Sequence, residues 1–80
     1  MLDDKELASK VRLAERQVRL IEGQPSFWTH VKSGKKYIAL GCALDEATLK
    51  PLVIYAREDA RYIRWSRPMD VFLARFQLDI

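Results

Sequence analysis

Residues 26–44, SFWTHVKSGKKYIALGCAL, decide the fold, because they place two strand-like runs on either side of a turn. The first run, Ser26 to Lys32, alternates, with Phe27 and Val31 on one face and Trp28, His30 and Lys32 on the other. The sequence Ser-Gly-Lys-Lys at 33–36 is typical of a hairpin turn, in which Gly34 supplies the positive φ. The stretch therefore predicts an antiparallel hairpin.

The second run, Tyr37 to Leu44, is apolar on both faces. A strand of this kind is central in its sheet, or has another element packed closely against its flat side. We expect the N-terminal helix to pack there. Strict alternation would give the strand one face of larger side chains and one face of small side chains. The large side would consist of Ile38, Leu40, Cys42 and Leu44, and the small side of Ala39, Gly41 and Ala43.

Three more strands are expected downstream, over 52–56, 62–67 and 75–80, with a loop over 45–51 and a charged turn over 57–60. Pro68 suits the first turn of a short helical segment that runs to Phe72. About five short strands in so short a chain predict a small β-barrel, because strand closure removes exposed sheet edges. We expect a core that contains Ile38, Leu40, Leu52, Ile54, Phe72 and Phe76.

Upstream of this hairpin the hydrophobic period is that of a helix. Asp3 or Asp4 can cap its start, Gly23 suits the position just after its end, and Pro25 prevents it from resuming. We therefore divide the chain into an amphipathic helix within residues 1–23 and a barrel over residues 24–80. The apolar stripe consists of Leu7, Val11, Ala14, Val18 and Ile21.

Two further sectors of the helix carry side chains of one kind. One sector is basic, and it is either a solvated face or a phosphate-contacting face. The other is apolar and suggests a second contact surface, most simply with another copy of the chain in a homodimer. The basic sector holds Lys5, Arg12, Arg16 and Arg19, and the apolar sector holds Leu2, Leu13 and Leu20.

Composition limits the classes of protein that remain. The chain has 80 residues, of which 31% are charged, and a net charge of +3, which permits an anionic partner without requiring one. So small a core excludes a deep cleft between two lobes. The longest apolar run is far below the roughly 20 residues that span a bilayer, and the acidic start is unlike a signal peptide. We expect a cytoplasmic protein with no membrane partner.

Three motifs in residues 30–72 resemble those of a small family of bacterial and phage domains, the domain of unknown function sixteen fifty-three. The first has the form H-x-K-x-G-x-x-Y, the second T-L-x-x-L-V-x-Y, and the third W-x-R-P-x-x-x-F. Two positions depart from the family pattern: Ala47 stands where glutamate is usual, and the turn at 57–59 lacks aromatic and glycine residues. The resemblance implies an SH3-like barrel and no established activity. The matching residues are His30, Lys32, Gly34, Tyr37, Thr48, Leu49, Leu52, Val53, Tyr55, Trp65, Arg67, Pro68 and Phe72.

The sequence offers little catalytic chemistry. His30 is the only histidine and Cys42 the only cysteine, which excludes a two-histidine metal site, a cysteine zinc site and an internal disulfide. The three glycines are too scattered to form a phosphate loop, and neither Ser33 nor Ser66 lies in a nucleophile elbow. We predict a protein without catalytic residues, metal or cofactor, and keep a small enzyme as the weakest alternative.

A binding surface is the remaining interpretation, because aromatic residues alternate with cations in the strands. Arg67 has two readings: an ion pair with Asp70 or Glu46, or a guanidinium fork for a carboxylate or phosphate. We predict a non-catalytic module for a phosphate-bearing ligand, either nucleic acid or a nucleotide. The alternative is a protein-interaction or oligomerisation module that uses the helix and a barrel groove. The predicted ligand-binding residues are His30, Lys32, Tyr37, Tyr55, Trp65 and Arg67.

Overall fold

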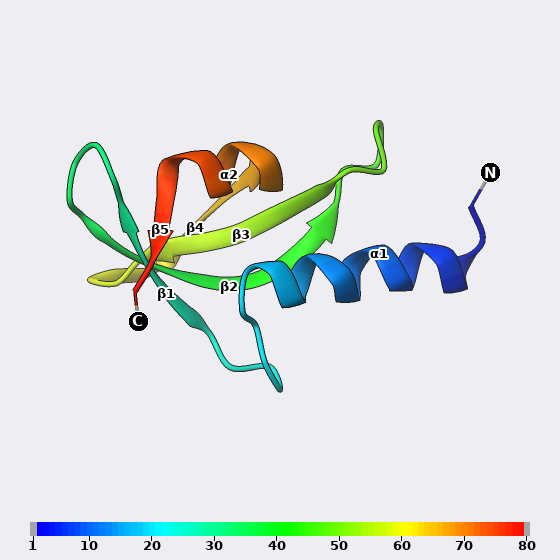
Figure 1. The fold of residues 1–80 in the computed structure, drawn as a ribbon, viewed down its shortest axis with the longest axis horizontal. Helices are drawn as coiled ribbons and strands as arrows, with labels where there is room; N and C mark the ends of the chain where they lie inside the picture. The colour runs from blue at the N-terminus through cyan, green and yellow to red at the C-terminus, as the bar shows by residue number, and fades with distance from the viewer. Residues whose placement is uncertain (1, 80) are drawn as a thin grey trace.

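The computed structural model describes residues 2–79 and consists of one helix, a five-stranded sheet and a second, short helix before the last strand (Figure 1). No helix in this part of the chain is long and apolar enough to cross a bilayer. In chain order the elements are α1 (Asp4–Gln17), β1 (Ser26–His30), β2 (Lys36–Leu44), β3 (Pro51–Arg57), β4 (Ala60–Pro68), α2 (Met69–Arg75) and β5 (Phe76–Leu78).

The strands form one antiparallel sheet in the order β4-β3-β2-β1-β5. The predicted fold class, mainly β with an added N-terminal helix, is confirmed. The strand order is compatible with the SH3-like barrel that the family resemblance implies. Within residues 2–79, however, β4 and β5 form no ladder with each other, so hydrogen bonding does not close the sheet into a full ring.

A β-bulge in β2 changes which side chains share a face. Ala39 lies opposite Tyr55, whereas Gly41 lies opposite Ile54, so Leu40 is the extra residue. A bulge of this kind reverses the alternation beyond it. The predicted large and small sides of this strand are therefore wrong. One face, which we call the core face, carries Tyr37, Ala39, Cys42 and Leu44, and the opposite face carries Ile38, Gly41 and Ala43.

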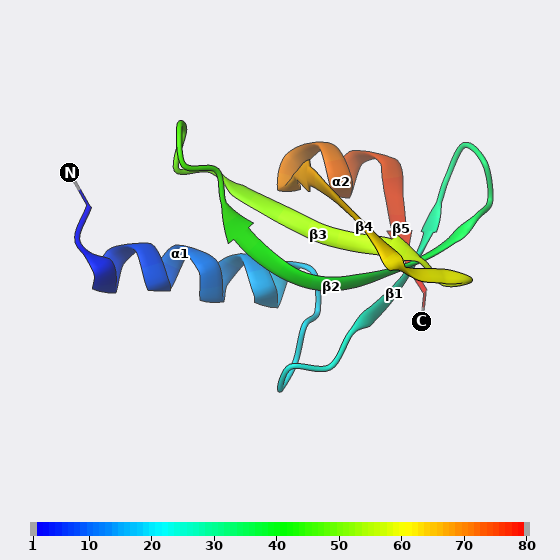
Figure 2. The ribbon, with the colours of Figure 1, turned by 180° about the vertical axis from the view of Figure 1, so that it is seen from behind.

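Both helices contribute to the core face. Val18, just after α1, and Phe72 of α2 belong to the same buried cluster as Val53 and Tyr55 of β3. Figures 1 and 2 show α1 alongside β2, and α2 beside β3 and β4. The helix does pack near the second strand, as expected. It lies on the core face, which carries Ala39 of the predicted small side and Cys42 of the predicted large side, because the bulge exchanges the two sides beyond Leu40.

The start of α1 is as predicted, and its end is not. Asp3 is the N-cap, with its Oδ1 accepting from the Glu6 N–H at 2.8 Å. The helix ends at Gln17, because Arg19 adopts a left-handed φ of 62°. The Arg19 N–H then donates to the Arg16 carbonyl and the Leu20 N–H to the Glu15 carbonyl, which is a Schellman motif. Ile21 is therefore outside the helix and 63% exposed, not part of the apolar stripe.

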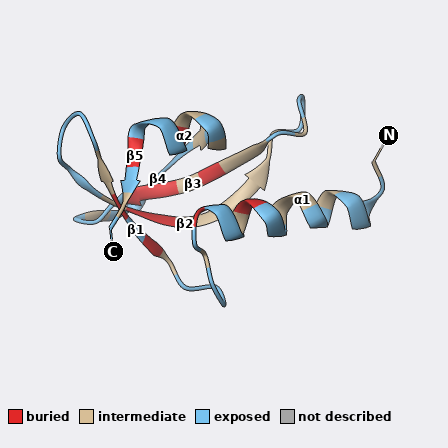
Figure 3. Ribbon diagram, viewed as in Figure 1, coloured by how far each residue is buried: buried red, intermediate tan, exposed pale blue. Residues whose placement is uncertain are grey.

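Aromatic rings dominate the core cluster. Figure 3 shows its buried positions on the strands and the helices that face one another. Phe72 and Phe76 are stacked with centroids 4.3 Å apart, and the Trp28 ring meets Phe72 edge-on at 5.1 Å. Of the predicted core residues, Ile38, Phe72 and Phe76 are buried, whereas Leu40, Leu52 and Ile54 are only partly buried. The last predicted strand is shorter than expected, at Phe76–Leu78, and its predicted end at Ile80 lies outside the described residues.

One buried hydroxyl connects α1 to the sheet. The Ser26 Oγ donates to the backbone carbonyl of Val18 and accepts from the Trp28 Nε1–H at 2.8 Å. Ser26 is the buried polar residue of the described chain, and its hydroxyl satisfies one acceptor and one donor. The end of the helix is thereby fixed against β1 and the aromatic core.

We predict that Ser26→Ala lowers the free energy of unfolding by about 1–3 kcal/mol, because it leaves a buried carbonyl and a buried indole N–H without partners. Chemical denaturation measures the change. The matched control is Ser9→Ala in α1, where the hydroxyl bonds only to the exposed Lys5 carbonyl. The control substitution should leave the free energy of unfolding unchanged or raise it slightly, since alanine is a better helix former than serine. Equal effects of the two substitutions would contradict the role assigned to Ser26.

Candidate ligand-binding pocket

The β1–β2 turn and the β3–β4 turn lie at the same end of the molecule, away from the start of α1 (Figures 1 and 2). The register here places Tyr37 opposite Arg57, and Tyr55 opposite Trp65. Directly opposite residues share a face of the sheet. Arg67, two residues beyond Trp65, shares that face too. Aromatic and cationic side chains from three strands are thus gathered on the core face.

These side chains surround a cavity of about 330 Å³, which we call the aromatic pocket. Its volume is at the lower end of the range for small-molecule sites, which begins at roughly 300 Å³. Three aromatic and three cationic residues line it, and none of the lining residues is acidic. They are Lys35, Tyr37, Tyr55, Arg57, Trp65 and Arg67.

Packing against Phe76 fixes two of the three rings. The Tyr37 and Tyr55 centroids lie 5.2 and 5.4 Å from that of Phe76. Tyr55 is buried, whereas Trp65 is 55% exposed. Trp65 can therefore offer a ring face to a ligand, while the tyrosines hold the shape of the pocket.

Arg67 is fixed along one edge of its guanidinium. Its Nε donates to the Tyr55 hydroxyl at 2.8 Å, and its Cζ lies 5.8 Å from the centroid of the Phe76 ring. The ion pairs found within residues 2–79 involve other residues, so neither predicted pair, with Asp70 or with Glu46, is formed. A partly buried guanidinium without a carboxylate partner in the described chain favours the anion-fork reading.

Arg57 differs from Arg67, because a carboxylate balances its charge. Its Nε and Nη2 bond to the two oxygens of Asp59 at 2.9 and 2.8 Å. These hydrogen bonds lower the pKa of Asp59 and raise the pKa of Arg57. Lys35 takes part in no ion pair of the described chain. The surplus positive charge of the aromatic pocket therefore comes from Lys35 and Arg67.

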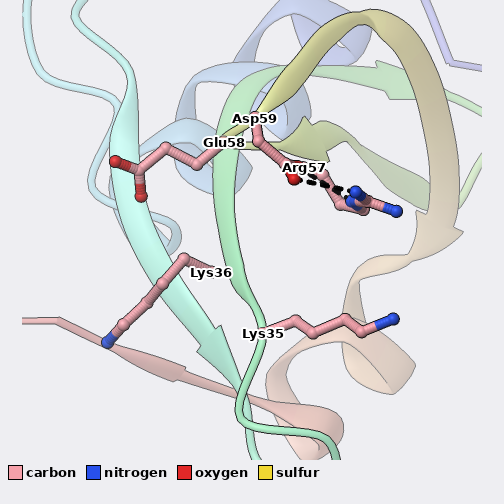
Figure 4. A pocket seen from close by; sticks show the side chains of 5 residues that line it. All are labelled: Lys35, Lys36, Arg57, Glu58 and Asp59. Carbon is pink, nitrogen blue, oxygen red and sulfur yellow. Dashed lines mark hydrogen bonds and ion pairs between the residues drawn. The ribbon is translucent and has the colours of Figure 1, made fainter.

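A second cavity of about 510 Å³, the charged cavity, adjoins the aromatic pocket (Figure 4). Lys35 and Arg57 line both cavities, and the second has no aromatic lining residue. In Figure 4, Lys35 and Lys36 point away from each other, with the Arg57–Asp59 pair on the side of Lys35. The residues that line the charged cavity are Lys35, Lys36, Arg57, Glu58 and Asp59.

The structure brings together four of the six predicted site residues. His30 does not line the pocket: its Nδ1 lies 2.8 Å from the Ser33 Oγ, and its ring packs 5.0 Å from Phe76. It supports the turn that precedes Lys35. Lys32 is exposed in that turn and lines none of the cavities found. The four that converge are Tyr37, Tyr55, Trp65 and Arg67.

Sequence reasoning missed Lys35 and Arg57 as members of the site. Each lies two residues from a tyrosine in the sequence, but membership of the candidate site depends on strand register. Tyr37 lies opposite Arg57 only because the bulge at Leu40 shifts the pairing of β2 with β3. The signal that could have found them is Gly41, because an isolated glycine inside a strand pattern indicates a bulge and hence a shift in strand pairing.

The predicted helix surfaces are not continuous with this pocket. Lys5, Arg12 and Arg16 are exposed along α1, while Arg19 lies beyond its end. The apolar sector is divided as well. Leu13 is 55% exposed, but Leu20 lies after the helix and packs against the core cluster, so the two do not share one helix face. The third member, Leu2, is partly buried.

The described residues hold no arrangement that indicates catalysis. Groups of three or more histidine, cysteine or acidic side chains that could hold a metal are absent from residues 2–79. Burial, and to a smaller extent the negative charge of Glu15, raise the pKa of Cys42 to about 11. Its thiol is therefore protonated, and unreactive as a nucleophile, at neutral pH.

The fold and the pocket define a small, mainly β domain with an aromatic and cationic cavity at one end. Residues 26–79, which include every strand and α2, match the family described as Protein of unknown function (DUF1653). The chain belongs to this family, and the resemblance seen in the motifs is confirmed. No curated protein and no solved structure matches the chain.

We predict that native Cys42 reacts with iodoacetamide at pH 8 about 100-fold more slowly than in the unfolded chain. The reason is that its pKa rises from 9.0 to about 11, and each unit of pKa reduces the thiolate tenfold. Mass spectrometry of timed, quenched samples measures both rates. Comparable rates in the two states would show that burial does not protect this thiol.

Proposed function

We propose that the protein is a non-catalytic binding module for a phosphate-bearing ligand, a nucleotide or a nucleic acid, and that the aromatic pocket is its site. One observation carries the proposal. Arg67, fixed by Tyr55 and without a carboxylate partner in the described chain, lies beside the exposed ring of Trp65 in a cavity with no acidic lining residue.

The two parts of a nucleotide match the two kinds of side chain in the pocket. A base can stack on Trp65, an interaction worth about 1–3 kcal/mol per base. A phosphate can accept hydrogen bonds from the terminal nitrogens of Arg67, whose planar fork suits two oxygens at once. Lys35 supplies a second charge at the rim of the same cavity.

The different environments of the two tryptophans provide the assay. Trp28 is buried and bonded to Ser26, whereas Trp65 faces the pocket. Stacking of a base on Trp65 should quench its fluorescence, which can be titrated with nucleotides, single-stranded DNA and RNA. Binding through phosphate should weaken as salt increases, because counterions compete with the cations. Absence of quenching and of calorimetric heat with every one of these ligands would overturn the proposal.

We predict that Arg67→Lys weakens binding by about tenfold or more, since lysine keeps the charge and loses the two-point geometry. The matched control is Arg64→Lys, an exposed residue of the same strand that lines neither cavity. Fluorescence titration gives the affinities, and thermal melting gives the stability of each variant. If Arg67→Lys lowers only the melting temperature and leaves affinity unchanged, Arg67 is structural and the proposed site is wrong.

An oligomerisation module remains the second candidate, and the exposure of Leu13 favours it. In this proposal two chains contact each other through α1, most simply as a homodimer. Leu13→Glu should then dissociate the dimer and leave the fold intact. Light scattering on the unaltered protein at about 10–50 μM, where modest interfaces form, tests it directly. A monomer at that concentration would exclude this candidate.

A further inference from the structure

We infer that the ligand is a single strand of at least two nucleotides, with one base in the aromatic pocket and the next in the charged cavity. The inference rests on the proposed function, because it concerns the same site. It selects an oligonucleotide over a free nucleotide, and the observations for it are the continuity of the two cavities and the distribution of charge between them.

The two cavities share residues where they meet. Lys35 and Arg57 line both cavities, so these two cations stand where one cavity passes into the other, whereas Lys36 lines the charged cavity alone and is paired with Asp79. Arg67 lines the aromatic pocket alone. A nucleotide strand alternates phosphate and base, and this order of residues alternates in the same way. One phosphate would meet Arg67, a base would stack on Trp65, and the following phosphate would meet Lys35 and Arg57.

The junction is suited to a phosphate that carries a single negative charge. Arg57 uses its Nε and Nη2 on Asp59, so its orientation is fixed and much of its charge is balanced. Lys35 extends on the same side as this pair in Figure 4 and takes part in no ion pair of residues 2–79. One surplus positive charge at the junction matches one phosphodiester.

The far side of the charged cavity argues against a polyphosphate tail. Glu58 and Lys36 line this side (Figure 4); Lys36 is paired with Asp79, whereas Glu58 is exposed and forms no ion pair within the described chain. The terminal phosphates of a nucleoside triphosphate would meet the carboxylate of Glu58 and be repelled. A base would be bound there and not repelled, because carboxylate oxygens accept hydrogen bonds from exocyclic amino groups such as that of cytosine.

The experiment compares ligands of increasing length by Trp65 fluorescence and calorimetry. The series consists of cytidine monophosphate, cytidine triphosphate, the 5′-phosphorylated dinucleotide and hexanucleotide of cytidine, and the DNA hexamer of the same sequence. We expect the dinucleotide to bind about tenfold or more tightly than the monophosphate, a difference typical of one added charged contact. The triphosphate should bind no more tightly than the monophosphate. The RNA and DNA hexamers show which sugar the site prefers.

Salt dependence counts the phosphates. Two phosphate contacts on a single strand predict a slope of log K against log salt of about −1.4, since each contributes roughly −0.7.

The substitution Glu58→Gln tests the role of the carboxylate in the charged cavity. Its control is Glu46→Gln, in an exposed loop outside both cavities. Only the first should increase affinity for the triphosphate, by about threefold or more, because it removes a carboxylate that repels phosphate.

The outcomes separate the two proposals. If the monophosphate binds as tightly as the dinucleotide, or the triphosphate binds much more tightly than the monophosphate, the site takes a free nucleotide; the inference is then wrong and the proposed function stands. If neither nucleotides nor strands bind, both are wrong. The last comparison is the affinity of the dinucleotide relative to that of the monophosphate. If Glu58→Gln and Glu46→Gln have the same effect on this ratio, the assignment of the second base to the charged cavity is wrong.

Discussion

The packing of Phe76 is the interaction on which both the core and the pocket depend. This residue begins β5, a strand of only three residues, and its ring is stacked on Phe72 of the preceding helix. The same ring contacts Tyr37, Tyr55 and the guanidinium of Arg67. The floor of the aromatic pocket is therefore the surface of the hydrophobic core. Aromatic pairs in this geometry add about 0.5–1.5 kcal/mol each beyond the area they bury.

Hydrogen bonds supplement the small hydrophobic core at three places. Ser26 connects α1 to β1, and His30 bonds to Ser33 in the β1–β2 turn. At the third place Thr29 and Lys36 both bond to Asp79, just after β5. The Thr29 hydrogen bond, and then Lys36, lower the pKa of Asp79. Because that pKa is depressed, the contribution to stability is present above the ordinary aspartate pKa and is lost as the pH falls through the depressed value.

The sequence predicts those features that depend on local chemistry. Asp3 is recognisable as an N-cap, and Gly34 as the positive-φ residue of a turn, from neighbouring residues alone. The end of α1 is different. Arg19, not Gly23, begins the left-handed termination, and a tertiary contact accompanies it: the chain turns there so that Leu20 packs against the core cluster.

In the candidate site, too, local sequence predicts some members and contacts between distant strands decide the others. Motif and composition lead to Tyr37, Tyr55, Trp65 and Arg67, since rings and cations recur there at short spacing. Strand register decides the other members. The bulge at Leu40 exchanges the faces of β2, and Gly41, an isolated glycine directly after it, is the local residue that marks it. Lys35 and Arg57 enter the pocket, and His30 and Lys32 stay outside it, because of pairing between strands distant in sequence.

The residues of the pocket divide into those that also stabilise the fold and those that do not. Tyr55 is buried in the core cluster while its hydroxyl orients Arg67, so its ring and its hydroxyl serve two purposes. Trp65 and Lys35 lie at the surface, with 55% of Trp65 exposed, and the core does not need them. An exposed tryptophan costs a small domain some solubility and adds little to its stability. Its position beside an arginine that lacks a carboxylate partner in the described chain supports the proposed recognition of a ligand.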